Sequence, residues 1–284
     1  MDMPRKSLIF IIIPIILIGC APKMQKPLLI CPGKETTADA LVALQSQSQN
    51  MTSLYAKGKS RLRYYDEKGK KRKESLDVKI LVKSFDEIYL RGDMSIVPKA
   101  IILGSNKREF WLAIKPKEIS AYWWGRWSEL DSSQNILINP KTLLEALGIT
   151  RIDIGADWSL SNEGPFDILT QRRKGKVVKK IYIYCCDYSI RKIEYFNADG
   201  KVIARVELQE YKEVTDNFSV PSLIEVTTYG SDKKEDSFSI TFNLKSIQPR
   251  EITARQNELF ERPPSKGYKN LYKLENGSWI EFQQ

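Results

Sequence analysis

Several stretches of this sequence follow a period of two, with residues of one kind alternating with residues of another. The clearest are residues 75–83, 110–114, 202–209 and 237–244. Successive side chains of a β-strand point to opposite faces of a sheet, so this period is typical of strands with one dry face and one wet face. The pattern predicts that half-buried strands form the body of the chain.

Short turn signals separate these stretches, at residues 68–70, 174–176, 197–200 and 230–232. Such short connections force neighbouring strands to run antiparallel. We expect about ten to eleven strands between residues 55 and 244, by the pattern of alternation. No internal repeat or low-complexity linker divides the chain, which favours one domain.

Two helices interrupt the strand pattern. Thr36 begins a capping box, and helical spacing of apolar residues follows over residues 37–50. Asn139 and Pro140 have the order of an N-cap and a first helical residue, and Gly148 stands where a helix of this length would end. We therefore expect an N-terminal helix and a short helix in mid-chain.

The N-terminus has the pattern of a secretory signal peptide. Arg5 and Lys6 form a positive region, and an apolar core follows over residues 8–18. This core is too short to span about 30 Å of hydrocarbon, and Pro14 would weaken a spanning helix. Residues 1–19 are therefore predicted to be a signal peptide rather than a membrane helix.

The end of this segment, residues 17–20, resembles the bacterial lipobox. The resemblance implies that Cys20 carries acyl groups such as palmitate and becomes the first residue of a lipid-anchored chain; an ordinary buried cysteine is the alternative. Ala21 in place of Asp is compatible with the outer membrane. The proline-rich residues 20–35 would be a lipidated tether.

The remaining cysteines fit export. Cys31 could pair with Cys185 or Cys186 in an oxidising periplasm, or all three could be free thiols. The chain has no histidine and no CxxC spacing. This excludes Ser-His and Cys-His catalytic pairs and His-ligated metals, and argues against zinc and redox centres. We expect no catalytic residue, no metal and no cofactor.

The order of elements resembles the LolA/LolB superfamily of lipoprotein carriers over residues 36–250. Loose local matches lie at residues 55–65, 191–196 and 221–229. The resemblance implies an α+β, mainly antiparallel fold: a strongly curved, unclosed β-barrel with both helices as a lid over an apolar cavity for acyl chains. Residues 251–284 exceed this pattern and are expected to pack on the domain as a C-terminal extension.

The residues expected to line the cavity are the apolar ones that share the concave face or the lid helices. They are Leu41, Leu44, Val78, Ile80, Val82, Ile88, Leu90, Phe110, Leu112, Ile114, Leu143 and Leu147. The sequence cannot separate an open cavity from a packed core, because the same residues would fill either one.

Three surface features carry weaker predictions. Apolar residues flank Pro98, so Ile96 and Val97 are candidates to contact a membrane, or this segment is a simple bend between two strands. Residues 57–83 carry eleven Lys/Arg and four Asp/Glu, which suits anionic headgroups or a solvated hairpin tip. Aromatic residues at 122–127 suit a membrane interface, sugar stacking or, as we favour, packing against the core.

The sequence thus predicts a membrane-anchored lipoprotein of the cell envelope, on the periplasmic side, at the outer membrane. It would bind acyl chains of lipids or lipoproteins for transport or insertion, without nucleic acid as a partner. The alternative is a structural or assembly lipoprotein with a filled core that binds another envelope protein. A carboxylate-pair hydrolase using Asp153, Asp157, Glu163 and Asp167 is disfavoured, since acids between strands are ordinarily solvated.

Overall fold

The computed structural model describes residues 29–65, 69–116, 119–129, 140–149, 152–229 and 238–283. The expected signal peptide, Cys20, Asn139 and the turn at 230–232 lie outside the described residues. Among the described residues, no helix has the length and hydropathy that crossing a bilayer requires.

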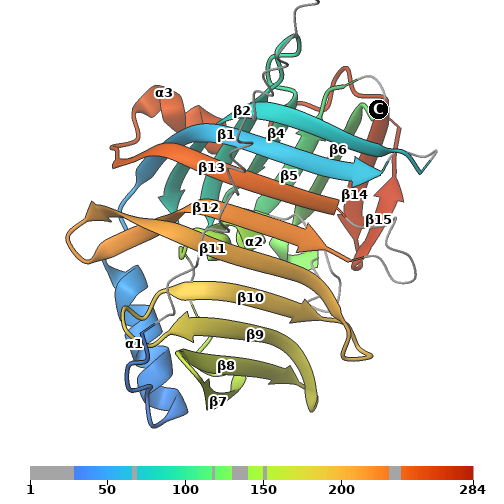
Figure 1. The fold of residues 1–284 in the computed structure, drawn as a ribbon. Helices are drawn as coiled ribbons and strands as arrows, with labels where there is room; N and C mark the ends of the chain where they lie inside the picture. Colours follow the sequence, from blue (N-terminus) through green and yellow to red (C-terminus); the bar gives the residue numbers. More distant parts are fainter. Residues whose placement is uncertain are drawn as a thin grey trace, which may run out of the picture.

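One large curved sheet makes up most of the molecule (Figure 1). Its strands are β1 (Leu54–Tyr65), β2 (Lys71–Ser84), β3 (Glu87–Asp93), β4 (Ile101–Ser105), β5 (Glu109–Ile114), β6 (Ala121–Arg126), β7 (Asp157–Glu163), β8 (Phe166–Arg173), β9 (Lys176–Tyr184), β10 (Ile190–Phe196), β11 (Val202–Thr215), β12 (Phe218–Thr228), β13 (Phe238–Pro249), β14 (Asn270–Glu275) and β15 (Ser278–Glu281). The sheet order is β15-β14-β6-β5-β4-β3-β2-β1-β13-β12-β11-β10-β9-β8-β7. It is not closed, and β15 and β7 are its edges.

The sheet is antiparallel apart from the β14–β6 pair, which is parallel. This confirms the expected mainly antiparallel, unclosed sheet. The strand count of ten to eleven was too low, since the described chain has thirteen strands between Leu54 and Pro249. The short strand β4 explains part of the error: Ile102 to Ser105 are all buried, so this strand shows no alternation of dry and wet residues.

Gly58 allows two of the central strands to approach closely. The β1–β13 register shifts between Lys57 and Gly58, which marks a β-bulge. A Cβ atom on Gly58 would lie 2.0 Å from the backbone oxygen of Asn243. Only glycine fits here, and a bulge of this kind increases the local twist and bend of a strand.

The two helices begin and end close to the expected residues. Helix α1 (Thr37–Gln49) is capped by Thr36, whose hydroxyl accepts a hydrogen bond from the Asp39 backbone N–H at 3.1 Å. Helix α2 (Pro140–Ala146) is followed by Gly148 in the left-handed region, with φ of +71°. Helix α1 contacts β7, β8 and β12, whereas α2 contacts β4 and lies behind β11 and β12 in Figure 1.

Each face of the sheet has its own core. On the concave side, Ile80 and Val82 of β2 join a large cluster that includes both helices. The intervening Leu81 joins a second cluster on the opposite face, together with Trp111 and Phe260. The second cluster is covered by the C-terminal segment, which contains α3 (Ala254–Asn257), a 3₁₀ turn at Glu258–Phe260 and β14. A further 3₁₀ turn, Trp127–Glu129, follows β6.

Candidate functional site

The concave face of the sheet brings most of the expected cavity residues together. Nine of the twelve belong to one buried cluster: Leu41, Leu44, Val78, Ile80, Val82, Ile88, Leu90, Leu143 and Leu147. Leu112 is half-buried against the same cluster. Phe110 is buried elsewhere, with its ring 4.6 Å from Trp127 and 6.2 Å from Trp279, and Ile114 is half-buried outside both clusters.

Helix α2 lies inside the curve of the sheet rather than on its surface. Leu143, Leu144 and Ala146 are buried, and so is Glu145. Lys141 at its start is exposed and Thr142 is half-buried, so the helix reaches solvent at its first turn and is enclosed over the rest of its length. Helix α2 therefore fills the space between β4 on one side of the sheet and β9 and β10 on the other.

Glu145 is held there by one residue from each of two neighbouring strands. Its Oε1 lies 3.1 Å from Nζ of Lys179, and its Oε2 accepts a hydrogen bond of 2.5 Å from the hydroxyl of Tyr195. Burial opposes ionisation, but the Lys179 charge and the two hydrogen bonds outweigh it and hold the pKa of Glu145 below its usual value. Burial and the Glu145 carboxylate raise the pKa of Tyr195.

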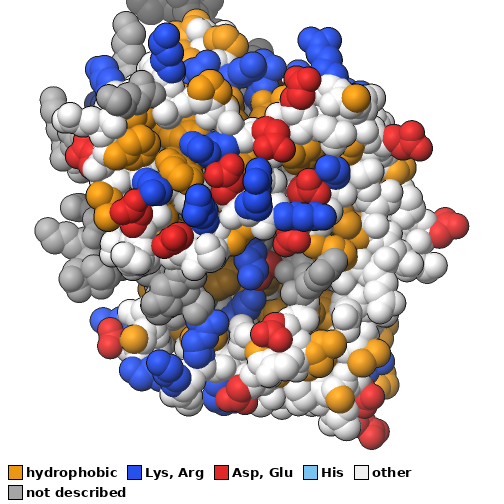
Figure 2. Space-filling model, turned by 180° about the vertical axis from the view of Figure 1, so that it is seen from behind, with side chains coloured by type: hydrophobic (Ala, Val, Ile, Leu, Met, Phe, Trp, Pro, Cys, Tyr) orange, Lys and Arg blue, Asp and Glu red, His pale blue; other side chains and the backbone are white. Residues whose placement is uncertain are grey.

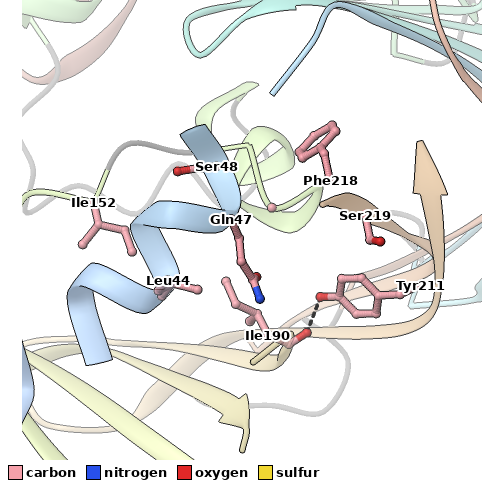
Figure 3. A pocket seen from close by; sticks show the side chains of 9 residues that line it. Leu44, Gln47, Ser48, Ile152, Ile190, Tyr211, Phe218 and Ser219 are labelled. Carbon is pink, nitrogen blue, oxygen red and sulfur yellow. Dashed lines mark hydrogen bonds between the residues drawn. The ribbon is translucent and has the colours of Figure 1, made fainter. Parts of the chain in front are cut away.

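A small pocket lies where α1 meets the sheet (Figure 3). Its volume is about 30 Å³, which is enough for little more than a water molecule. It is lined by Leu44, Gln47, Ser48, Gly148, Ile152, Ile190, Tyr211, Phe218 and Ser219. Of these, only Leu44 was expected, because the pocket combines residues from α1, three strands and a connecting segment that no periodic pattern in the sequence brings together.

The pocket wall is fixed by hydrogen bonds to the backbone. The hydroxyl of Tyr211 donates to the carbonyl of Ile190, and burial raises the pKa of Tyr211. Gln47 of α1 donates through Nε2 to the carbonyl of Asp187, at 3.1 Å. Helix α1 is therefore attached directly to the turn between β9 and β10.

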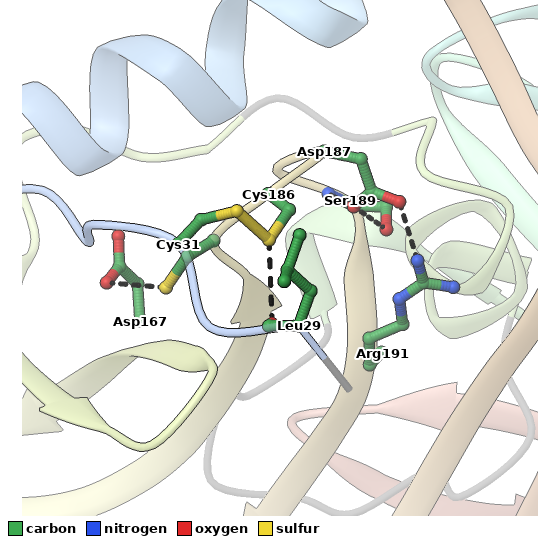
Figure 4. Close-up of a disulfide and its surroundings, with 8 residues drawn as sticks. Leu29, Cys31, Asp167, Cys186, Asp187, Ser189 and Arg191 are labelled. Carbon is green, nitrogen blue, oxygen red and sulfur yellow. Dashed lines mark hydrogen bonds and ion pairs between the residues drawn. A yellow bond between two sulfur atoms is a disulfide. The ribbon is translucent and has the colours of Figure 1, made fainter. Parts of the chain in front are cut away.

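A disulfide attaches the chain before α1 to the same turn (Figure 4). Cys31 pairs with Cys186, and Cys185 is free. This resolves the pairing that the sequence left open. The Cys185 thiol donates to Asp167 at 3.3 Å, and burial together with the Asp167 carboxylate raises its pKa to about 11. Cys185 is thus an unreactive neighbour of the disulfide at neutral pH.

Asp167 is the second attachment point of the segment before α1, and we call the disulfide and the Asp167 contacts together the clamp. Its carboxylate accepts hydrogen bonds from the Lys34 backbone N–H at 2.9 Å and from Asn162 Nδ2 at 2.7 Å. A Cβ atom on Gly33 would lie 2.2 Å from Asp167 Oδ1, so the segment packs tightly on the β7–β8 hairpin. The acidic residues proposed for hydrolysis do not converge: Asp157 and Glu163 stand at opposite ends of β7.

The apolar segment around Pro98 and the aromatic stretch at 122–127 differ in how far they are exposed to solvent. Ile96 is 90% exposed, whereas Val97 is half-buried against the concave core. Trp123 stacks on Tyr272 at 5.4 Å, and Tyr122 donates to the Pro263 carbonyl, so the aromatic stretch packs on the C-terminal segment.

Within the described ranges, no three His, Cys, Asp or Glu side chains come together as a metal site.

Figure 2 shows the face of the molecule opposite to that of Figure 1. Basic and acidic side chains alternate in a row across it, and below this row the surface is hollowed, with hydrophobic side chains at the floor and Lys or Arg side chains beside them.

No protein-family model matches the chain, and no curated protein sequence matches it. Solved structures do match its fold. A domain described as an outer membrane lipoprotein-sorting protein from Vibrio parahaemolyticus aligns with a TM-score of 0.55 at 11% identity, over 78% of this chain and 94% of that one. A LolA superfamily protein from Nitrosomonas europaea aligns with a TM-score of 0.51 at 12% identity, over 81% and 99%.

A DUF1329 family protein from Desulfovibrio piger gives a TM-score of 0.51 at 13% identity, over 78% of this chain and 95% of that one. The chain therefore resembles the LolA/LolB superfamily in its fold, as the order of elements in its sequence predicted.

Proposed function

We propose that this protein is an envelope lipoprotein that holds acyl chains of lipids or lipoproteins against the concave face of its sheet, for transport or insertion. The observation that carries the proposal is the way this face is covered. A broad aliphatic surface, which includes Val78, Ile80 and Leu90, is closed by α1 and by the seven-residue helix α2 instead of by a second sheet.

Binding would exchange α2 for an acyl chain. The pocket of about 30 Å³ cannot hold a chain, so the helices must separate from the sheet before a ligand enters. Each methylene that leaves water contributes about 0.8 kcal/mol. Leu143, Leu144 and Leu147 supply comparable apolar surface when no ligand is present. Transfer then requires only a partner of higher affinity, and no chemical step.

Helix α2 is the better candidate for movement, because α1 is held at two points. The Cys31–Cys186 disulfide and the Gln47–Asp187 hydrogen bond both join it to the β9–β10 turn. Helix α2 is attached to the sheet by the polar contacts of Glu145 and by apolar packing. Both kinds of contact can be replaced by an amphiphile.

The lipid anchor at Cys20 is part of the proposal. Residues 20–28 span at most about 30 Å when extended, so an acylated Cys20 would keep Leu29 within that distance of the bilayer. The disulfide joins Cys31 to Cys186 of the β9–β10 turn. This turn would therefore lie near the periplasmic surface of the membrane that holds the anchor. This placement at the outer membrane agrees with Ala21.

The structural alternative also has an observation in its favour. The described interior is filled, with Leu44, Leu144 and Leu147 all buried. A filled core suits a lipoprotein that binds another envelope protein through a sheet edge such as β7 or β15. The two functions differ in whether the purified protein carries lipid.

The test is native mass spectrometry on residues 21–284, exported to a periplasm without the acyl anchor and purified gently. Stoichiometric phospholipid or lipopeptide, identified after solvent extraction, supports the carrier function. Added photoactivatable fatty acid should then label Ile80 and Leu90 rather than the neighbouring Leu81 and Tyr89 of the opposite core. A lipid-free mass that persists after lipid is added favours the structural alternative.

A further inference from the structure

Lys179 of β9 and Tyr195 of β10 are paired across the two strands. Paired residues of adjacent strands share one face of the sheet, and this face is the concave one, because Ile181 and Ile193 are paired two residues away and belong to the concave core. Two polar groups thus stand beside each other in an otherwise aliphatic wall.

Both groups donate to a single buried carboxylate. Lys179 Nζ lies 3.1 Å from Oε1 of Glu145, and the Tyr195 hydroxyl lies 2.5 Å from Oε2. The side chains of Lys179 and Glu145 are only 18% and 10% exposed. A buried ion pair commonly contributes no more to stability than apolar residues of the same volume would, so stability alone does not account for it.

We propose that Lys179 and Tyr195 form a binding site for the anionic headgroup of an amphiphile, and that Glu145 occupies this site when no ligand is bound. The proposal rests on the proposed function and adds to it the chemical class of the ligand. Lys179 and Tyr195 each donate one hydrogen bond, so the ligand group must have two acceptor oxygens on one atom. A phosphodiester and a fatty-acid carboxylate both have such a pair of oxygens.

One movement would prepare both parts of the site. Glu145 follows Leu144 on α2, and Leu147 comes directly after this helix; both leucines belong to the concave core. When α2 leaves, Lys179 and Tyr195 lose their carboxylate while the aliphatic wall beside them loses its cover. An amphiphile can replace both contacts, because its headgroup accepts the hydrogen bonds of Lys179 and Tyr195 and its acyl chain covers the aliphatic wall.

The outer face of the same two strands supplies a matched control. Tyr182 donates to Glu194 at 2.9 Å, and Lys192 lies 3.4 Å from the same carboxylate. This is again a Glu with a Tyr and a cation, but on the face away from the concave core, since Tyr182 and Glu194 alternate with Ile181 and Ile193. Lys180, next to Lys179, points to this outer face.

The experiment is native mass spectrometry of the full chain released from nonionic detergent micelles, titrated with three amphiphiles that carry the same oleoyl chains. Mono-oleoyl phosphatidylglycerol presents a phosphodiester, oleate presents a carboxylate, and mono-oleoyl glycerol is neutral. We expect the anionic lipids to bind about tenfold more tightly than the neutral one, as a charge-assisted hydrogen bond pair implies. The stronger of the two anions identifies the natural headgroup chemistry.

Variants assign the preference to the site. Lys179→Met and Tyr195→Phe should reduce the ratio of anionic to neutral binding several-fold, whereas Lys180→Met and Tyr182→Phe should leave it unchanged. Because Lys179→Met leaves Glu145 buried without its cation, the double variant Glu145→Gln/Lys179→Met is measured as well. Glu145→Gln alone should strengthen anion binding, since it removes the competing charge.

The outcomes separate this proposal from the one on which it rests. A wild-type chain that binds none of the three amphiphiles overturns the proposed function. A chain that binds all three equally, or a double variant that keeps the full anionic preference, overturns the headgroup site while leaving the acyl-chain carrier intact.

Discussion

Cys31 and Cys186 form a disulfide across 155 residues, and this bond joins the segment before α1 to the turn between β9 and β10. The same turn accepts the Gln47 hydrogen bond from the second half of α1. One short turn therefore positions the whole N-terminal helix over the edge of the concave face.

Cys31→Ala should destabilise the protein strongly, because a cross-link over so long a loop removes about 5 kcal/mol of chain entropy from the unfolded state. Thermal unfolding by calorimetry measures the loss, and hydrogen exchange should show faster exchange in α1 than in β11. Cys185→Ser keeps the disulfide and serves as the control. Equal melting temperatures for Cys31→Ala and wild type would contradict the clamp.

Acid should weaken the attachment of α2. The pKa of Glu145 is lower in the folded protein than its ordinary value of about 4.5, so its stabilising effect is complete above that value and is lost as the pH falls through the folded pKa. Urea midpoints between pH 6 and pH 3 should fall less steeply for Glu145→Gln than for wild type. Identical slopes would show that Glu145 does not contribute.

Gly58→Ala should cost at least about 2 kcal/mol, since its Cβ would lie 2.0 Å from a backbone oxygen that a flexible side chain cannot move aside. Gly155→Ala is the comparison, because its Cβ would approach only Asp153 Oδ1, at 3.4 Å. Denaturant unfolding of both variants checks the difference, and a Gly58 variant as stable as the Gly155 variant would refute it.

Phe260→Ala should lower the free energy of unfolding by about 3–5 kcal/mol, the usual cost of removing a buried aromatic side chain. Phe260 is 2% exposed and packs in the second core. The exposed neighbour Glu258→Ala should have little effect. A small loss at Phe260 would mean that the C-terminal segment covers the sheet without stabilising it.

Ile96→Asp should weaken binding of residues 21–284 to vesicles, if the β3–β4 loop contacts membrane. The structure exposes Ile96 almost fully and packs Val97 against the core, so Ile96 alone is the informative substitution. Sedimentation with anionic vesicles measures the effect. Unchanged binding would assign this loop the simpler role of a bend between strands.

The sequence predicted the features that local chemistry determines. Thr36 and Gly148 mark helix boundaries through hydrogen bonding and backbone conformation, and both helices begin and end within a residue or two of their expected ends. Residues such as Val78 and Ile80 were found because period two is visible wherever one face of a strand meets solvent. Strand β4 lacked that contrast, since it is buried on both faces.

The parts that were missed depend on contacts between distant residues. Glu145 lies 34 residues from Lys179 and 50 from Tyr195, so no spacing joins them. A single charged residue inside Leu143-Leu144-Glu145-Ala146-Leu147 was nevertheless a signal, because a buried carboxylate requires a partner. The parallel pairing of β14 with β6 had no comparable signal, since tertiary packing alone selects it.

The strand order has a consequence for how the chain reaches its native state. The two central neighbours, β1 and β13, pair from Leu54 with Pro249 onward, although nearly the whole sheet lies between them in sequence. While the polypeptide is synthesised from its N-terminus, the edge of β1 that will pair with β13 stays unpaired until the last residues of β13 have emerged. Unpaired strand edges are prone to pair with other chains, so the folding yield of this protein should depend on chaperones that cover the edge or on rapid completion of the chain.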